Sequence, residues 1–352
     1  MKKLLYVASA FAFIACSSSK QALKDADANV DQAAKYAATI TAKELGTHLF
    51  IYASDKFEGR DTGEPGQKLA VEYLKKFYVD EDIVSPLGGD DYFQEVPAEW
   101  INKNVRRGTF KGSENVVAFI KGSEKPDEIV VISAHLDHEG IKNGKIYNGA
   151  DDDGSGTVAI LEIAQAFQMA TKAGKGPKRS ILFLHVTGEE KGLLGSKYYT
   201  DVDPLFPLAN TVCNLNIDMV GRTDDRHKAN PNYVYLIGSD KLSTELHAVS
   251  EEVNKKYMNI NLDYKYNDEN DPNRFYYRSD HYNFAKNNVP IIFYFNGTHV
   301  DYHKHTDTPD KINYELLENR TRLVFHTAWE VANKETRILA DKAEVKEAAV
   351  GK

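Results

Sequence analysis

The sequence predicts an α/β protein with a mostly parallel, twisted sheet that helices cover on both faces. Short apolar segments alternate along the chain with segments of helical spacing, as they do where helices connect parallel strands. The apolar segments are rich in branched and aromatic residues, which is typical of strands buried on both faces. The 352 residues, 42% of them hydrophobic, suffice for a sizeable core in one large domain or two modest ones.

The first residues have the pattern of an export signal. Residues 1–3 are positively charged, and the apolar run 4–14 is too short to span a bilayer. The small residue before Cys16 resembles a bacterial lipobox, although Phe13 stands where leucine is usual. In that interpretation Cys16 carries the lipid, and the protein is exported and anchored in the cell envelope or periplasm of a bacterium. The alternative, a secretory peptide cleaved elsewhere, also places the protein outside the cytoplasm.

Composition predicts how the chain is divided. Residues 1–16 form the signal segment, and residues 17–40, rich in Ala, Lys and Asp, are expected to be a tether. One folded domain is expected over 41–334, opening with the capping box that starts at Thr41. The polar residues 335–352 are expected to form a frayed tail.

Within the folded domain, apolar spacing and composition predict each element in order. Helices are expected at 41–54, 67–78, 154–170, 193–199, 241–257 and 314–333. Strands are expected at 116–120, 129–133, 180–186, 212–219, 233–237 and 290–295. Loops are expected at 59–66 and 88–112.

Two adjacent carboxylates, Glu189 and Glu190, follow the strand 180–186 directly after Gly188. Open α/β sheets place their active sites at the carboxyl ends of strands. Because neighbouring side chains point in different directions, one carboxylate could hold a metal ion while the other faces a water. A solvated acidic turn is the alternative, and the dipeptide alone favours that alternative.

Further polar groups stand just past other predicted strands. They are His135 and Asp137, Asp151 to Asp153, Asp218, and Tyr302, His303, His305 and Asp307. Singly, each has an ordinary explanation as a helix cap, a turn residue or a surface histidine. Together with the glutamate pair, they predict one site along one edge of the sheet.

The chemistry of this set is that of a metal site. It contains imidazoles and carboxylates and no thiolate, which suits Zn²⁺, with Mn²⁺ or Co²⁺ as substitutes. Two histidines and at least three carboxylates exceed what one open zinc site needs, and they suffice for two ions that share a carboxylate. Ions about 3.5–4 Å apart can activate a water and polarise a carbonyl. One glutamate would remain to take the proton from that water.

Five motifs, in this order, resemble the co-catalytic zinc aminopeptidases of metallopeptidase family twenty-eight, which includes glutamate carboxypeptidases and glutaminyl cyclases. The motifs are His135-x-Asp137, Gly149 to Gly156, Thr187 to Glu190, Asn216 to Gly221, and Tyr302-His303-x-x-x-Asp307-Thr308. The resemblance covers roughly residues 41–333, including Phe57 to Arg60 and Ser279 to His281. It implies the phosphorylase/hydrolase-like fold of that family.

The resemblance also implies a ligand set for two Zn²⁺ ions per chain. One ion would take His135 and Asp218, and the other would take Glu190 and His303. Asp152 would bridge the two ions. His305 falls two residues past the family position and is not expected to bind metal.

Three further roles come from the same resemblance. Glu189 would be the general base, and Tyr302 would hydrogen-bond the developing oxyanion. Asp137 would fix the tautomer of His135. The peptide bond between Asp152 and Asp153 would be cis.

The resulting hypothesis is an exported zinc aminopeptidase that removes N-terminal residues from peptide substrates. Alternatives are a carboxypeptidase or dipeptidase with the same site, a glutaminyl cyclase, and a binding ectodomain without metal. The last would show gaps among the five candidate ligands, and none is missing. The net charge of −8, with acids and bases interspersed, argues against nucleic acid, and a lipid anchor is the only membrane contact expected. Side-chain preference and oligomeric state stay open.

Overall fold

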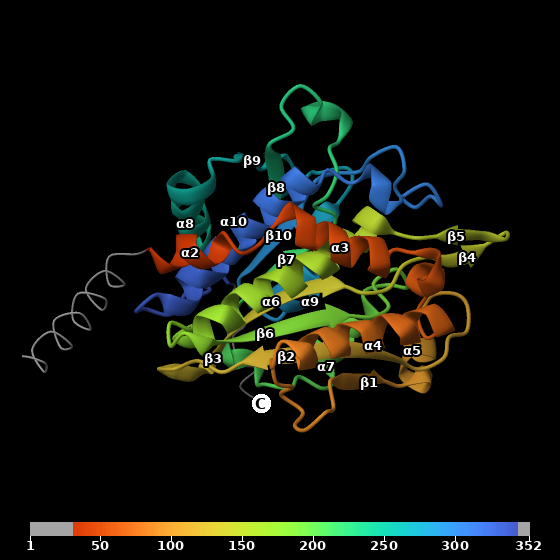
Figure 1. Cartoon of the computed structure of the whole chain (residues 1–352), viewed down its shortest axis with the longest axis horizontal. Coiled ribbons are helices and arrows are strands. Elements are labelled where there is room, and N and C mark those ends of the chain that lie inside the picture. The colour runs from red at the N-terminus through yellow and green to blue at the C-terminus, as the bar shows by residue number, and fades with distance from the viewer. Residues whose placement is uncertain (1–30, 344–352) are drawn as a thin grey trace, which may run out of the picture.

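The computed structural model describes residues 31–343 and contains one eight-stranded sheet and a separate hairpin (Figure 1). In spatial order the strands of the sheet are β1 (Phe93–Val96), β2 (Ser113–Ile120), β6 (Arg179–Val186), β3 (Lys125–His135), β7 (Thr211–Ile217), β10 (Ile291–Phe295), β8 (Tyr233–Ile237) and β9 (Asn261–Asp263). The hairpin consists of β4 (Gly140–Lys142) and β5 (Lys145–Tyr147).

The centre of the sheet is parallel. Strand β3 pairs in parallel with β6 and β7, and β7 pairs in parallel with β10. Strands β1 and β2 on one flank and β8 on the other pair antiparallel with their neighbours towards the centre, while β9 pairs in parallel with β8. The predicted α/β class with a mostly parallel sheet is confirmed.

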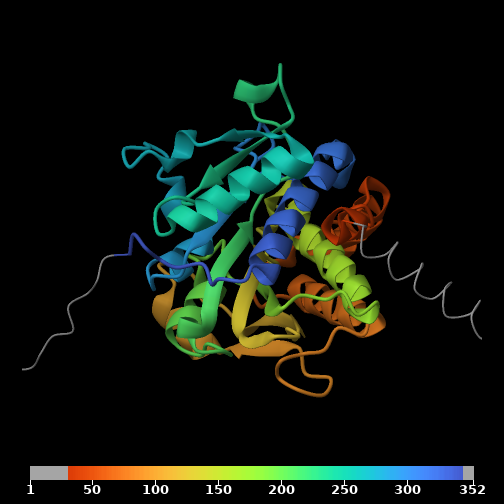
Figure 2. The same ribbon diagram turned by 90° about the vertical axis from the view of Figure 1, so that its left-hand side faces the viewer.

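Helices cover both faces of the sheet, as the buried-strand composition predicted. Alternate residues of β3 show why, because Val130 and Ile132 pack into one core cluster while Ile129 and Val131 pack into another. The first cluster includes α6 and α10, which lie side by side in Figure 2, and the second includes residues of α7 and α9. The helices are α2 (Gln32–Ala37), α3 (Ala42–Tyr52), α4 (Pro65–Asp80), α5 (Ala98–Asn104), α6 (Gly156–Lys172), α7 (Leu194–Asp201), α8 (Thr244–Val253), α9 (His281–Ala285) and α10 (Tyr314–Asn333).

The folded region extends beyond the expected 41–334 at both ends. Helix α2 lies within the expected tether. It belongs to the folded region because Ala33, Tyr36 and Ala37 form a buried stripe, and Tyr36 stacks on Trp329 of α10. Ile338, in the expected tail, is also buried. The signal segment 1–16 with Cys16, the first part of the tether and the last nine residues lie outside the described range.

The predicted loop over 88–112 contains β1 and α5. A four-residue flanking strand and a seven-residue polar helix are too short to give a clear periodic signal. Within residues 31–343 the structure has no helix whose length and apolar character would allow it to cross a membrane.

Candidate metal centre

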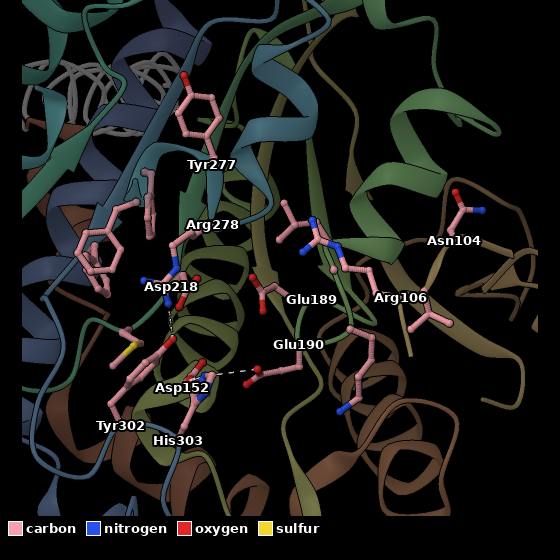
Figure 3. Close-up of a pocket in the computed structure, with 18 of the residues that line it drawn as sticks. Asn104, Arg106, Asp152, Glu189, Glu190, Asp218, Tyr277, Arg278, Tyr302 and His303 are labelled. Atoms are coloured by element: carbon pink, nitrogen blue, oxygen red, sulfur yellow. Dashed lines mark hydrogen bonds and ion pairs between the residues drawn. The ribbon is translucent and has the colours of Figure 1, made fainter. Parts of the chain in front are cut away.

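The candidate residues lie where the central strands end. His135 is the last residue of β3, Asp218 directly follows β7, and the glutamate pair follows β6 after a short turn. Because these strands run parallel, their carboxyl ends meet at one edge of the sheet. Figure 3 shows the side chains around one cavity, among them Asp152, Glu189, Glu190, Asp218, Tyr302 and His303.

One group of donors consists of His135, Asp152 and Asp218, all buried. His135 Nε2 lies 3.2 Å from Asp152 Oδ1 and 3.7 Å from Asp218 Oδ1. His135 Nδ1 lies 3.0 Å from the backbone oxygen of Asp137, and a carbonyl can only accept, so Nδ1 carries the hydrogen when the ring is neutral. Nε2 then presents its lone pair to the two carboxylates, as a metal ligand would.

A second group forms around the other oxygen of the same aspartate. His303 Nε2 lies 3.1 Å from Asp152 Oδ2 and 3.3 Å from Glu190 Oε2. The two oxygens of Asp152 therefore face two different histidines. This is the arrangement that a carboxylate shared by two ions requires.

His138 is a member of the site that the sequence reasoning missed. Its side chain is fully buried, and Nδ1 lies 2.8 Å from Glu190 Oε1 and 3.9 Å from Asp152 Oδ2. A side chain at Gly149 would collide with the ring of His138, so this glycine allows the backbone to fit against the imidazole. The one available signal was that His138 stands three residues after His135, at the same strand end.

The donors fit a metal ion because several are buried and face one another without forming hydrogen bonds. Within the described residues Asp152 Oδ2, Glu190 Oε1 and both ring nitrogens of His138 make no hydrogen bond, although His138 Nδ1 lies against Glu190 Oε1 and His303 Nε2 lies against Asp152 Oδ2. Buried polar atoms normally make a hydrogen bond. Nitrogen and oxygen donors with no thiolate, some of them within 4.8 Å of one another, match the ligand preference of zinc.

Neighbouring groups hold the loop that carries Asp152. The peptide bond between Asp152 and Asp153 is cis, as the resemblance implied. Asp153 Oδ1 accepts hydrogen bonds from the backbone N–H groups of Gly156 and Met219. Asp307, from the same motif as His303, accepts through Oδ2 from the N–H groups of Asp151 at 2.9 Å and of Asp152 at 3.2 Å. These bonds fix the backbone on either side of the shared carboxylate.

Glu189 lies in the same cavity but apart from both donor groups. Its backbone N–H donates to Asp137 Oδ1 over 3.1 Å, and Thr62 Oγ1 donates to Asp137 Oδ2 over 2.8 Å. Burial raises the pKa of Glu189 well above its usual range, with His135 opposing the shift and Glu190 adding to it. A carboxylate with a raised pKa is better suited to accept a proton near neutral pH.

Asp137 therefore acts differently from expectation. Its carboxylate was expected to fix the tautomer of His135, but Asp137 Oδ1 lies 3.9 Å from His135 Nδ1. The backbone oxygen of Asp137 contacts the ring, and the carboxylate positions the start of the Glu189–Glu190 turn. His305, which was left out of the ligand set, lies outside the donor groups, with Nε2 at 2.8 Å from Lys145 Nζ.

Tyr302 borders the cavity next to His303. Arg278 Nη2 donates a hydrogen bond to the Tyr302 hydroxyl oxygen over 3.2 Å, drawn in Figure 3. Burial raises the pKa of Tyr302, so the phenol keeps its proton. Since the phenol oxygen accepts from Arg278, the hydroxyl hydrogen is free to point into the cavity. The cavity has a volume of about 810 Å³, large enough for a short peptide.

Comparison with known proteins identifies the family. The model of peptidase family M28 matches residues 115–328, which is more than half of the chain and includes all five candidate ligands. The chain belongs to peptidase family M28.

Among curated relatives of this M28 peptidase is a probable glutamate carboxypeptidase, AMP1, from Arabidopsis thaliana. It is 33% identical over 157 residues, which cover 39% of this chain and 21% of the relative. The leupeptin-inactivating enzyme 1 of Streptomyces exfoliatus is 27% identical over 201 residues, which cover 56% of this chain and 38% of the relative. The chain thus spans less than two fifths of the length of either relative.

Solved structures share the fold. The LapA aminopeptidase of Legionella pneumophila has a TM-score of 0.64 at 21% identity, with 86% of this chain and 75% of that chain covered. The zinc aminopeptidase BSAP of Bacillus subtilis has a TM-score of 0.63 at 17% identity, with 86% and 99% covered. Membership of family M28 supports a metallopeptidase, which is a hydrolase, and the solved structures show that the fold is shared.

Replacing His138 with alanine should weaken metal binding by this M28 peptidase. The substitution removes the imidazole that lies against Glu190 Oε1 and leaves a buried space beside that carboxylate. Loss of a partner that orients a metal ligand typically costs about 10–100-fold in metal affinity. Zinc affinity measured by chelator competition checks this, with His305→Ala as the matched control. Equal affinities in both variants would mean that His138 does not contribute to the metal centre.

Proposed function

We propose that this protein is an aminopeptidase that binds two Zn²⁺ ions per chain and hydrolyses the first peptide bond of its substrates. The observation that carries the proposal is the arrangement of Asp152 between two histidine–carboxylate groups, with Glu189 separate from both. His135 and Asp218 would hold one ion, Glu190 and His303 the other, and Asp152 both. Zinc bound by these residues would supply an activated water and polarisation of the scissile carbonyl.

Glu189 supplies the proton transfers in this proposal. It takes the proton from the attacking water and passes it to the leaving nitrogen, which needs a proton to depart. Its place in the cavity, apart from both donor groups, leaves its carboxylate free for both steps. The hydrogen bond from its N–H to Asp137 fixes where the Glu189 turn begins.

Tyr302 stabilises the charge that develops on the carbonyl oxygen. Its hydroxyl hydrogen donates to that oxygen, while Arg278 donates to the phenol oxygen from the other side. An N–H donor on the phenol oxygen strengthens the hydroxyl as a donor, because linked hydrogen bonds polarise one another. Donors placed in advance of the reaction stabilise the transition state more than the ground state.

The choice of aminopeptidase is supported by the solved structures with this fold, which include enzymes described as aminopeptidases. The curated relatives named as probable glutamate carboxypeptidases keep a carboxypeptidase or dipeptidase as the second candidate. Both candidates use the same metal centre and differ in which end of the peptide is bound.

A substrate panel tests the proposal. Peptides with a free N-terminus, the same peptides with an acetylated N-terminus, and the same peptides with an amidated C-terminus are incubated with zinc-loaded enzyme. We expect release of the N-terminal residue from all peptides with a free amine, none from acetylated peptides, and no turnover after chelation. Cleavage of acetylated peptides that requires a free C-terminus would instead establish a carboxypeptidase.

We also propose that the protein is exported and lipid-anchored through Cys16. The support is the charged start, the short apolar run and the small residue before Cys16. Cys16→Ser should abolish labelling by a lipid precursor and release the protein from membranes. Fractionation of cells that express both forms measures this, and unchanged membrane attachment of the variant would contradict the lipobox.

A further inference from the structure

The loop formed by residues 105–109, here called the arginine loop, borders the cavity that contains Glu189. Arg106 and Arg107 follow helix α5, and both line the cavity. Figure 3 places Arg106 on one side, Asp218 and Tyr302 on the other, and Glu189 between them. The loop therefore faces the groups proposed to carry out the reaction.

The arginine loop is held at both ends. The side chain of Asn102 and the backbone of Phe110 exchange two hydrogen bonds of 2.8 Å each, one in each direction. Lys197 of α7 donates to Asn104 Oδ1 over 2.8 Å. The loop is thus tied to two helices next to the cavity, and its arginines are presented from a fixed base.

Neither arginine of the loop has a partner in the described part of the chain. Among residues 31–343, Arg106 and Arg107 make no hydrogen bond, ion pair or ring contact, whereas every other arginine in that range makes at least one. Lys191, a third cation of the cavity, is paired with Asp61 at 2.9 Å. The two guanidinium groups are exposed and therefore available to a ligand.

We propose that Arg106 and Arg107 bind a carboxylate in the part of the peptide that follows the scissile bond. Guanidinium groups match carboxylates in shape and charge, and they form paired hydrogen bonds with them. This inference rests on the proposed aminopeptidase function, which sets the direction of the substrate.

The apolar side of the cavity supports that direction. Met219, Phe275, Phe293 and Phe295 line it, and Met219 directly follows Asp218. This wall suits the side chain of an apolar N-terminal residue. With that residue beside Asp218, the rest of the substrate passes Glu189 and reaches the arginine loop. The carboxylate is then either the C-terminus of a short peptide or an acidic side chain of a longer one.

The test compares substrates that differ only in this charge. They are Leu-Gly-Gly, its C-terminal amide, the amide of Leu-Glu-Gly, and uncharged leucine p-nitroanilide. The enzymes are the zinc-loaded wild type, the double variant R106Q/R107Q, and Lys103→Gln, which removes a charge from α5 outside the cavity.

For the wild type we expect kcat/KM to be about 10-fold higher for a substrate with the carboxylate than for Leu-Gly-Gly amide. This factor corresponds to the lower end of the range of free energies that hydrogen bonds to charged groups contribute. R106Q/R107Q should lose this preference and keep its turnover of leucine p-nitroanilide, and Lys103→Gln should behave as the wild type. A preference confined to Leu-Gly-Gly assigns the C-terminal carboxylate, and one confined to the Leu-Glu-Gly amide assigns the acidic side chain.

Two results would overturn the inference while leaving the proposed function intact. One is equal cleavage of the acid and amide substrates by the wild type. The other is a preference that persists in the double variant. Failure of the wild type to cleave any substrate with a free amine would instead overturn the proposed function, and this inference with it.

Discussion

Replacing Glu189 with glutamine should give a folded, zinc-loaded protein whose kcat is lower by about 10²–10⁴-fold. The amide has nearly the shape of the carboxylate but cannot accept a proton from water. Both donor groups around Asp152 remain complete in this variant, because Glu189 belongs to neither. Elemental analysis and steady-state kinetics on the same preparation measure the two effects together.

The neighbouring substitution provides the comparison. Glu190→Gln removes the carboxylate whose Oε2 lies 3.3 Å from His303 Nε2, so its zinc content should fall. If Glu189→Gln loses zinc while Glu190→Gln keeps both ions, the two assignments are reversed. If both variants keep full activity, neither carboxylate takes part in the reaction.

Asp152→Asn should have the largest effect on metal content, because its two oxygens face both histidines. Asparagine keeps the shape of the side chain but lacks the charge that two cations would share under the proposed function. The loss in affinity should exceed the roughly 10–100-fold that follows removal of an outer partner of a ligand. Zinc at 100 times its dissociation constant stabilises a protein by about 2.7 kcal/mol per site, so the rise in Tm on adding zinc should largely disappear.

His303→Ala should lose less metal than Asp152→Asn and serves as its comparison. It removes a donor from one group only, so one ion should stay bound. His305→Ala, two residues later, should keep both ions, since His305 lies beside Lys145. Elemental analysis that finds one tightly bound metal in the wild type would contradict the shared role of Asp152.

The sequence predicted the position of the site because a simple rule governs it. Parallel strands end at one edge, so His135 and Asp218, at the ends of neighbouring strands β3 and β7, had to lie close together. Strand composition likewise predicted the central strands, since those buried on both faces consist of continuous apolar runs. The flanking elements β1 and β9 were missed because strands of four and three residues give little pattern.

Contacts that depend on exact packing could not be predicted from the sequence. His138 looks like an ordinary residue until the chain brings it against Glu190 and Gly149. The use of the Asp137 backbone, rather than its carboxylate, depends on small differences in distance at a strand end. The packing of helix α2 against the fold was not predicted, because its buried stripe is three residues long within a polar segment.

The bonds from Asp307 to the backbone of Asp151 and Asp152 have a consequence for biosynthesis. Asp307 follows Asp152 by 155 residues, which at about 5–20 residues per second is a delay of roughly 8–30 s on the ribosome. Until then the loop that carries Asp152 lacks the carboxylate that accepts from the N–H groups of Asp151 and Asp152, although His135 and Asp218 have already been made. Because His303 and Asp307 stand in the same late segment, the donor group around Asp152 Oδ2 and the backbone bonds of its loop form only after that segment has joined the fold, so completion of the candidate metal centre is a late event in folding.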